Sequence, residues 1–238
     1  DIRKQLPDIP ILALTATATP EVVDDIQERL LFREKNVFRM SFERKNLNYI
    51  VRSTENKEGE LLHILARVEG SAIVYVRNRD KTREIAKLLT EHGISASFYH
   101  AGLDTRDKDK RQLQWTEGTL RVIVATNAFG MGIDKADVRF VVHYNLCDSL
   151  EAYYQEAGRA GRDGADAECI LLYNSSDVTT AKFLINNASE NEELDPEARE
   201  TIRRQDMERL AIMVGYCKTK DCLRGYILEY FGQKHPDH

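Results

Sequence analysis

Two arginines in one short, glycine-rich segment are the residues whose types and spacing point most clearly to chemistry. The segment reads YQEAGRAGRDG over residues 154–164, and it places Arg159 and Arg162 three positions apart, with Gln155 one turn earlier. Residues three apart share a helix face, and glycines leave room for a bulky anion. Because a guanidinium is a charged, planar fork of donors, the pair suggests a clamp on a nucleotide polyphosphate. The alternative is a solvated basic helix end.

The elements that must position these arginines read as strands that alternate with helices. We expect strands at 9–15, 72–76, 94–99, 121–125, 138–144 and 167–173. We expect helices from Pro20 and at 61–68, 82–92, 106–115, 149–160 and 196–216. Such alternation implies crossover connections and a mainly parallel sheet with helices on both faces, and therefore an α/β fold.

Polar clusters follow three of these strands, and each alone reads as an ordinary turn. Their members are Arg77, Asn78, His100, Thr126, Gly130, Gly132 and Asp134. Because ligands bind outside the carboxyl ends of parallel strands, the convergence of the clusters on one edge favours a site. Amides and hydroxyls there could donate to phosphates without reading bases. Asp134 is acceptor-only and suits a ribose hydroxyl or an arginine.

Composition limits the classes of protein. The chain has 238 residues, a net charge of −5 and a pI near 5.8, so a nucleic-acid site must be a local basic surface. It has neither a signal peptide nor an apolar run near the ~20 residues that cross a bilayer. We therefore expect a soluble, cytoplasmic protein with no membrane partner. The four cysteines fit reduced thiols or a metal site better than secreted disulfides.

Several segments resemble the motifs of superfamily 2 helicases in the wording of the RecQ family. LTATAT (14–19), VATNAFGMGIDKADVRFVVHY (124–144) and YYQEAGRAGRDG (153–164) resemble motifs III, V and VI. The segment 73–89 resembles motif IV, and FERKNLNYIV (42–51) resembles the entry to the second RecA-like domain. The combination of FGMGIDK with QEAGRAGRDG is highly specific. The resemblance covers nearly the whole chain and implies a RecA-like sheet with a short helical C-terminal extension.

The resemblance also implies a division of the chain into three parts. Residues 1–40 would be the end of a first RecA-like domain, and 41–190 the second RecA-like domain. Residues 191–238 would be a linker and the start of the RecQ zinc-binding subdomain. On this reading the chain begins inside a domain, and its partner is the upstream RecA-like domain of the same protein.

Roles for the nucleotide site follow from the same resemblance. Arg162 matches the arginine finger that reaches the γ-phosphate, and Arg159 matches the second arginine of motif VI. Gln155 matches the glutamine that couples the nucleotide and DNA sites. Asp134, with Gly132 beside it, falls where motif V lines the cleft between domains. ATP and Mg²⁺ are the implied ligands.

The remaining matches imply a path for single-stranded DNA. Its residues would be Arg77, Asn78, His100, Thr126 and Gly130. One departure lies close by: Leu146-Cys147-Asp148 stands where the family more often has proline and a basic residue. The lost positive charge puts one backbone contact in doubt.

Two motifs of the family are absent from the sequence. It contains neither G-x-x-x-x-G-K-[ST], the loop that cradles a triphosphate, nor DExH, which binds magnesium. Both belong to the first RecA-like domain in the family. We therefore expect ATP and Mg²⁺ to bind mainly to an upstream domain, and the isolated chain not to hydrolyse ATP.

Cys222 matches the first ligand of the RecQ zinc site, because it precedes a segment that ends in YFG. Structural zinc needs four ligands. We expect the other zinc ligands to lie beyond His238, because Cys217, His235 and His238 would make only a makeshift ligand set with Cys222. In this chain Cys222 therefore reads as a free thiol, and zinc is expected in the full-length protein only.

The resemblance implies the C-terminal half of an ATP-dependent 3′–5′ DNA helicase that unwinds duplex DNA in repair and recombination. A DEAD-box RNA helicase is one alternative, although that class usually has HRxGRxGR in motif VI, where this chain has Gln155. A non-catalytic nucleic-acid-binding adaptor is the other, and it would not need an arginine finger.

Overall fold

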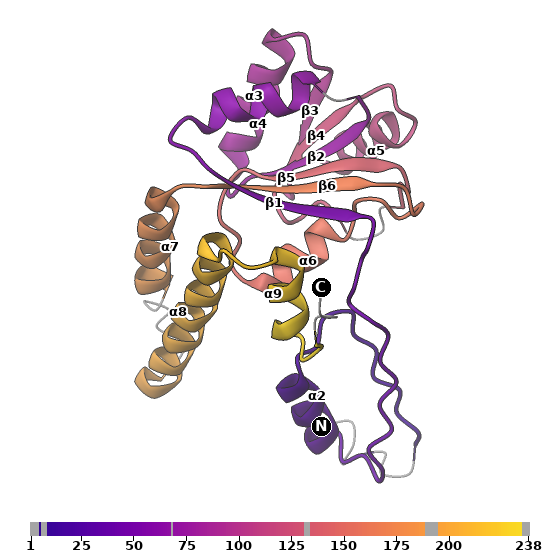
Figure 1. The fold of residues 1–238 in the computed structure, drawn as a ribbon, viewed down its shortest axis with the longest axis vertical. Coiled ribbons are helices and arrows are strands. Elements are labelled where there is room, and N and C mark those ends of the chain that lie inside the picture. Colours follow the sequence, from indigo (N-terminus) through magenta and orange to yellow (C-terminus); the bar gives the residue numbers. More distant parts are fainter. Residues whose placement is uncertain (1–4, 6–8, 68, 131–133, 189–194, 235–238) are drawn as a thin grey trace. The chain divides into compact units, whose positions relative to one another are not determined.

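The computed structural model describes residues 5, 9–67, 69–130, 134–188 and 195–234. The chain forms two compact units, Asp1–Arg44 with Lys220–His238, and Lys45–Thr219. The larger unit holds a parallel sheet and the helices that cover it (Figure 1). The smaller unit contains α2 (Pro20–Arg29) and α9 (Leu223–Tyr230).

The predicted parallel α/β fold is confirmed. The strands are β1 (Leu47–Ser53), β2 (Ser71–Tyr75), β3 (Ala96–Tyr99), β4 (Val122–Ala125), β5 (Val138–His143) and β6 (Ala167–Tyr173). They lie in the order β1-β6-β5-β2-β4-β3, and every pair of neighbours is parallel. The central strands are buried on both faces, which explains why their sequences are continuous apolar runs rather than alternating ones.

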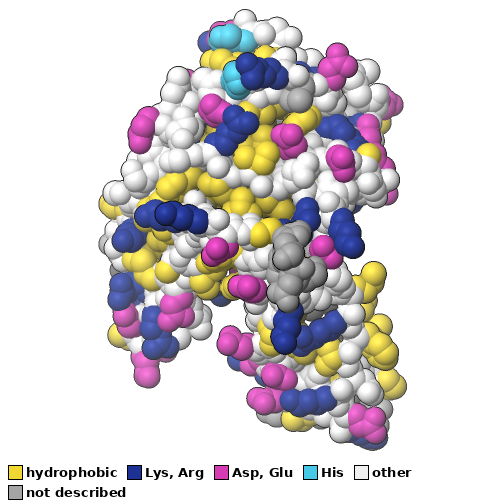
Figure 2. Space-filling view, in the orientation of Figure 1, with side chains coloured by type: hydrophobic (Ala, Val, Ile, Leu, Met, Phe, Trp, Pro, Cys, Tyr) yellow, Lys and Arg dark blue, Asp and Glu magenta, His cyan; other side chains and the backbone are white. Residues whose placement is uncertain are grey.

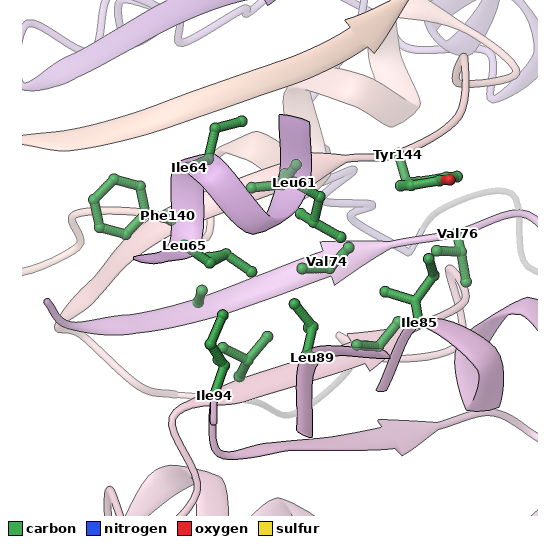
Figure 3. Close-up of a cluster of buried hydrophobic side chains, with 14 of the residues drawn as sticks. Leu61, Ile64, Leu65, Val74, Val76, Ile85, Leu89, Ile94, Phe140 and Tyr144 are labelled. Carbon is green, nitrogen blue, oxygen red and sulfur yellow. The ribbon is translucent and has the colours of Figure 1, made fainter. Parts of the chain in front are cut away.

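Helices cover both faces of this sheet (Figure 1). The covering helices are α3 (Lys57–Arg67), α4 (Arg79–Glu91), α5 (Thr105–Thr116) and α6 (Leu150–Ala157). Two further helices, α7 (Ser175–Ala188) and α8 (Pro196–Lys218), pack against each other, and α8 also contacts α6. The pattern of the sequence did not predict α7. On one face, Leu61 and Leu65 of α3 and Leu89 of α4 lie against strand side chains such as Val74 (Figure 3).

The opposite face is closed by aromatic side chains. Tyr153 of α6 is fully buried, and its hydroxyl accepts a hydrogen bond from the hydroxyl of Tyr216 in α8 at 3.2 Å. Trp115 of α5 is also buried, and its indole nitrogen donates to the carbonyl of Ala72 at 3.1 Å. Satisfied polar tips of this kind let large rings enter a core. Trp115 is therefore a core residue.

The start of the chain corrects one prediction and confirms another. The described part of 9–15 forms no strand, and Leu12 and Leu14 are exposed. A strand needs a neighbour for its backbone hydrogen bonds, and the described residues of the smaller unit offer none. The predicted helix start is correct, because the Thr19 hydroxyl caps α2 by accepting from the amide of Val22.

Candidate functional site

The structure separates the predicted site residues onto two edges of the sheet. Strands β2, β4 and β3 are adjacent, so the segments that follow them lie together at the carboxyl edge. The amide of Thr126, just past β4, donates to the carbonyl of Tyr99 at the end of β3 at 3.3 Å. Arg77, His100 and Thr126 thus share this edge, as predicted.

Asp134 does not share that edge, so the prediction of one common edge is wrong for this residue. The strands are parallel, and the link from β4 to β5 must therefore return to the amino edge of the sheet. Asp134 lies four residues before Val138, the first residue of β5, and its carboxylate is 3.6 Å from the guanidinium of Arg162.

At the carboxyl edge, Arg77 and Asn78 are held by local bonds. The guanidinium of Arg77 donates to the carbonyl of Leu146 at 3.3 Å, and its amide donates to the side chain of Asn145. The side-chain oxygen of Asn78 accepts from the amide of Lys81 at 2.8 Å and caps α4. The side-chain oxygen of Asn78 therefore caps a helix, a role that its position in the motif did not predict.

His100 is buried beside arginines. It is only 2% exposed, and its ring nitrogens have no hydrogen-bond partner among the described residues. Its ring stacks on Phe98, and the guanidinium of Arg111 lies 4.0 Å from the Phe98 ring centre. Burial lowers the pKa of His100, and the positive charges of Arg83 and Arg79 lower it further.

This shift predicts a pH dependence of stability. The pKa of His100 lies below its ordinary value of 6.5 in the folded protein, so the unfolded chain takes up the proton first as the pH falls. The free energy of unfolding should be constant above pH 6.5 and decrease as the pH falls below it. Urea unfolding measured above and below this pH should show a smaller decrease in the free energy of unfolding for His100→Gln than for the unmodified protein. The exposed His63 gives the control, His63→Gln, which should keep the full decrease; equal slopes in both variants would contradict the assignment.

The arginine segment does not form the predicted helix face. α6 ends at Ala157, and Arg159 and Arg162 follow it in turns. Gly158 is the C-cap of α6, and Gly161, in the turns that follow, adopts a positive φ of 55°. The two guanidinium groups therefore reach different partners, Gly130 and Asp134.

The Arg162 turn is fixed on both sides at the amino edge of the sheet. The amide of Gly161 donates to the carbonyl of Val138 at 2.9 Å. The side-chain amide of Asn46 donates to the carbonyls of Gly161 and Ala165, at 2.8 and 2.9 Å. Arg139 forms an ion pair with Asp163, which raises the pKa of the guanidinium and lowers that of the carboxyl.

The Arg162 side chain is partly exposed within this fixed turn. Its exposed fraction is 38%, and that of the Asp134 side chain is 92%. An exposed pair at 3.6 Å is weak, because water screens both charges. Gln155, on α6, is also exposed. The arrangement presents an arginine that can exchange Asp134 for a stronger anion.

Arg159 is half-buried against the β4–β5 link. Its guanidinium donates to the carbonyl of Gly130 at 2.6 Å. A Cβ atom at Gly130 would lie 2.0 Å from a terminal nitrogen of Arg159, so a larger residue there would displace the guanidinium. Gly132, the other glycine predicted for the site, lies outside the described residues.

Aromatic residues support this link from beneath. The hydroxyl of Tyr75 donates to the carbonyl of Phe129 at 3.0 Å, and burial raises the pKa of that hydroxyl. The Phe129 ring makes edge contacts with Tyr99 and Trp115, with centroids 4.8 and 5.4 Å apart. Phe129 therefore fixes the residue before Gly130.

Four positioning residues were missed by sequence reasoning. They are Asn46, Arg139, His143 and Glu156, and an imidazole nitrogen of His143 lies 2.9 Å from the Glu156 carboxylate. Asn46 and Arg139 lie in segments that resemble helicase motifs, which was the only signal. Their partners are distant in the sequence, so periodicity could not reveal them.

Cys222, predicted to be part of a zinc site whose other ligands lie beyond this chain, is placed in the smaller unit. This exposed residue stands at the N-cap position of α9 and makes no side-chain cap bond. Within the described residues it belongs to no group of three or more potential metal ligands. Residues 235–238, which include His235 and His238, lie outside the described part. Four-ligand coordination is therefore not supported by this thiol and its described surroundings.

None of the helices that the structure describes is both long enough and apolar enough to cross a membrane.

Comparison with known proteins agrees with the geometry. Residues 56–164 match the family described as helicase conserved C-terminal domain, and residues 175–238 match RecQ zinc-binding. The chain is 43% identical over 236 residues to the ATP-dependent DNA helicase RecQ of Bacillus subtilis, which covers 98% of the chain and 38% of that relative. It is 38% identical over 238 residues to the RecQ-like DNA helicase BLM of Xenopus laevis, covering 98% of the chain and 17% of the relative.

A solved structure shows the same fold in a more distant helicase. The DEAD-box protein SrmB of E. coli, crystallised with the regulator of ribonuclease activity A, aligns with a TM-score of 0.53 and 28% identity. The alignment covers 61% of this chain and 87% of SrmB's. The chain thus spans well under half the length of the two RecQ relatives. With both domain matches and this identity over nearly all its residues, it belongs to the RecQ family of superfamily 2 helicases.

Proposed function

We propose that the chain is the part of an ATP-dependent 3′–5′ DNA helicase that supplies an arginine finger and part of the single-strand track. The observation that carries the proposal is the state of Arg162. Its turn is fixed by Asn46 and Arg139, while its guanidinium stays exposed beside Asp134. An arginine finger needs a fixed backbone and an exposed side chain. Its guanidinium must be in position before negative charge develops on the phosphate.

Arg162 acts in this proposal by exchanging partners. In the described state its partner is the exposed Asp134. A γ-phosphate brought by a closing domain would offer more negative charge and bidentate acceptors, so the guanidinium would leave Asp134 for it. Asp134 would then be available to a ribose hydroxyl or to the same arginine after phosphate release.

Arg159 would connect the nucleotide side to the DNA side. It holds the carbonyl of Gly130, and a short turn joins that glycine to Thr126, where the amide of Phe129 donates to the Thr126 carbonyl at 3.0 Å. A movement of Arg159 would therefore be transmitted to the carboxyl edge through the turn at residues 126–130. Gln155, on the helix before it, would share this coupling.

The carboxyl edge would carry single-stranded DNA. Arg77, Asn78, His100 and Thr126 end adjacent strands there, with Gly130 beside them. The acidic chain offers no broad basic field, and on the face in Figure 2 the described basic and acidic side chains are interspersed. Individual donors at this edge would bind backbone phosphates without recognising the base sequence, which needs no broad basic surface.

Other parts of the enzyme would complete the site. The sequence has no phosphate-cradling P-loop and no DExH motif, so ATP and Mg²⁺ would be bound by another RecA-like domain. The proposed division remains 1–40, 41–190 and 191–238, with zinc bound through Cys222 in the full-length protein. The relatives' names support DNA as the substrate. The proposal also includes a role of the protein in DNA repair and recombination, and a location in the cytoplasm.

ATP hydrolysis by the full-length protein tests the proposal directly. We expect single-stranded DNA to stimulate the rate strongly and RNA of the same sequence to stimulate it little. Stronger stimulation by RNA would instead favour a DEAD-box type of activity, which the likeness to SrmB makes worth testing. A protein that binds DNA but hydrolyses no ATP would be an adaptor, and the proposal would be wrong.

A further inference from the structure

A cluster of potential metal ligands lines a pocket at the carboxyl end of β5. His143, Cys147 and Glu156 each offer one ligand atom, and these atoms lie within 4.8 Å of one another. They share a pocket of about 110 Å³, whose lining also includes Arg77 and Asn127. We propose that this pocket binds one zinc ion, at a site separate from the Cys222 region.

Zinc would draw the cluster together, because its ligand atoms now span up to 4.8 Å. Zinc bonds to nitrogen and oxygen are about 2.0–2.2 Å and to sulfur about 2.3 Å, so tetrahedral ligand atoms lie roughly 3.3–3.8 Å apart. The imidazole nitrogen of His143 and the carboxylate of Glu156 are now 2.9 Å apart, in a hydrogen bond. An ion between them would widen this separation by a few tenths of an ångström.

The ring of His143 is buried and held in place. Its side chain is 1% exposed, and Nε2, the nitrogen that faces the Glu156 carboxylate, would be the zinc ligand. Its ring is fixed between Tyr75 and Tyr153, with centroids 5.3 and 4.9 Å away. A fixed, buried imidazole next to a carboxylate and a thiol is a ligand set that zinc prefers.

Zinc binding would require the Cys147 thiol to lose its proton. Burial raises the pKa of that thiol well above its ordinary value, and the carboxylates of Glu156 and Asp148 raise it further. With zinc, a thiolate, a carboxylate and a neutral imidazole balance the two positive charges. Binding should release one proton from the thiol.

The fourth position would face the pocket. Three protein ligands and one open position are typical of zinc sites that hold a water molecule. The ion would join the end of β5, the turn after it and α6, the helix that carries Gln155 and leads to Arg159. It would thereby hold the motif VI helix against the sheet. The departure at Leu146-Cys147-Asp148 would then be the exchange of a phosphate contact for a metal ligand.

Cobalt substitution tests this site on the full chain. All variants carry Cys222→Ser, which removes the thiol of the zinc-binding region. We expect this background to bind one equivalent of Co²⁺ or Zn²⁺ and to show sulfur-to-cobalt charge-transfer absorption. Adding Cys147→Ser should abolish that absorption and weaken binding by more than ~100-fold, because outer-shell changes alone cost about 10–100-fold. Glu156→Gln should weaken binding and keep the absorption.

A second thiol provides the matched control. Cys217 is half-buried, burial raises its pKa to about 12, and it is not in the ligand group. Cys217→Ser should leave the stoichiometry and the absorption unchanged. Circular dichroism and urea unfolding check that each variant folds. The proposal is wrong if the folded background binds no metal, or if Cys147→Ser keeps the charge-transfer band.

Discussion

Replacing Arg162 by alanine in the full-length protein should lower DNA-stimulated ATP turnover by roughly 10³-fold or more, the range known for arginine fingers. The structure explains why the effect should fall on turnover. Arg162 is exposed, and its ion pair with the exposed Asp134 is weak. Stability should therefore change little, and KM for ATP should change much less than kcat.

Two further variants make this prediction specific. Arg162→Lys keeps the charge but loses the planar fork, so it should recover only part of the turnover. Arg204→Ala removes an exposed arginine of α8 and should leave turnover unchanged. An Arg162→Ala protein with near-normal kcat would remove Arg162 from the catalytic residues and leave the arginine-finger proposal without its main support.

Replacing Gly161 by alanine should destabilise the fold and misplace the Arg162 turn. Gly161 has a φ of 55°, and an added Cβ would lie 2.5 Å from the side-chain nitrogen of Asn46 and 2.7 Å from the backbone carbonyl of Ala165. The left-handed conformation alone costs a non-glycine residue about 1–3 kcal/mol. The contact with backbone adds to this cost, because backbone cannot rotate away. The free energy of unfolding, measured with urea, and the rate of ATP turnover should both decrease.

Gly164 provides a control that separates conformation from contact. Its φ of 83° is also left-handed, but a Cβ there would meet nothing within 4 Å. Gly164→Ala should therefore show only the conformational cost, about 1–2 kcal/mol, and should lose less turnover than Gly161→Ala. Equal losses of stability in the two variants would show that the Asn46 and Ala165 contacts do not matter.

Local sequence signals predicted the elements of this fold well. The buried runs of β2, β4 and β5 read as strands because a sheet covered on both faces needs apolar residues on both sides. Thr19 and Pro20 marked the start of α2, because a cap and a proline at the first position act within one turn. The prediction of a strand at 9–15 was wrong because a strand depends on a partner that its own sequence does not contain.

The arginine segment shows where sequence reasoning stopped. Its residue types alone pointed to phosphate chemistry, because a guanidinium binds phosphate wherever it stands. The helical geometry predicted for it was wrong, because α6 ends at Ala157 and the turns that follow it carry Arg159 and Arg162 to different partners. Spacing in a sequence indicates a shared face only while the helix continues.

The sequence by itself determined the parallel sheet, the family and the residue types available for phosphate binding, because all three depend on local pattern and composition. Only the tertiary structure decided that Asp134 lies with Arg162 rather than with Thr126, and that Asn46 and Arg139 hold the turn between them. It also decided that His143, Cys147 and Glu156 meet in one pocket. These contacts join segments distant in the sequence, and the order of the strands, which local pattern does not specify, brings them together.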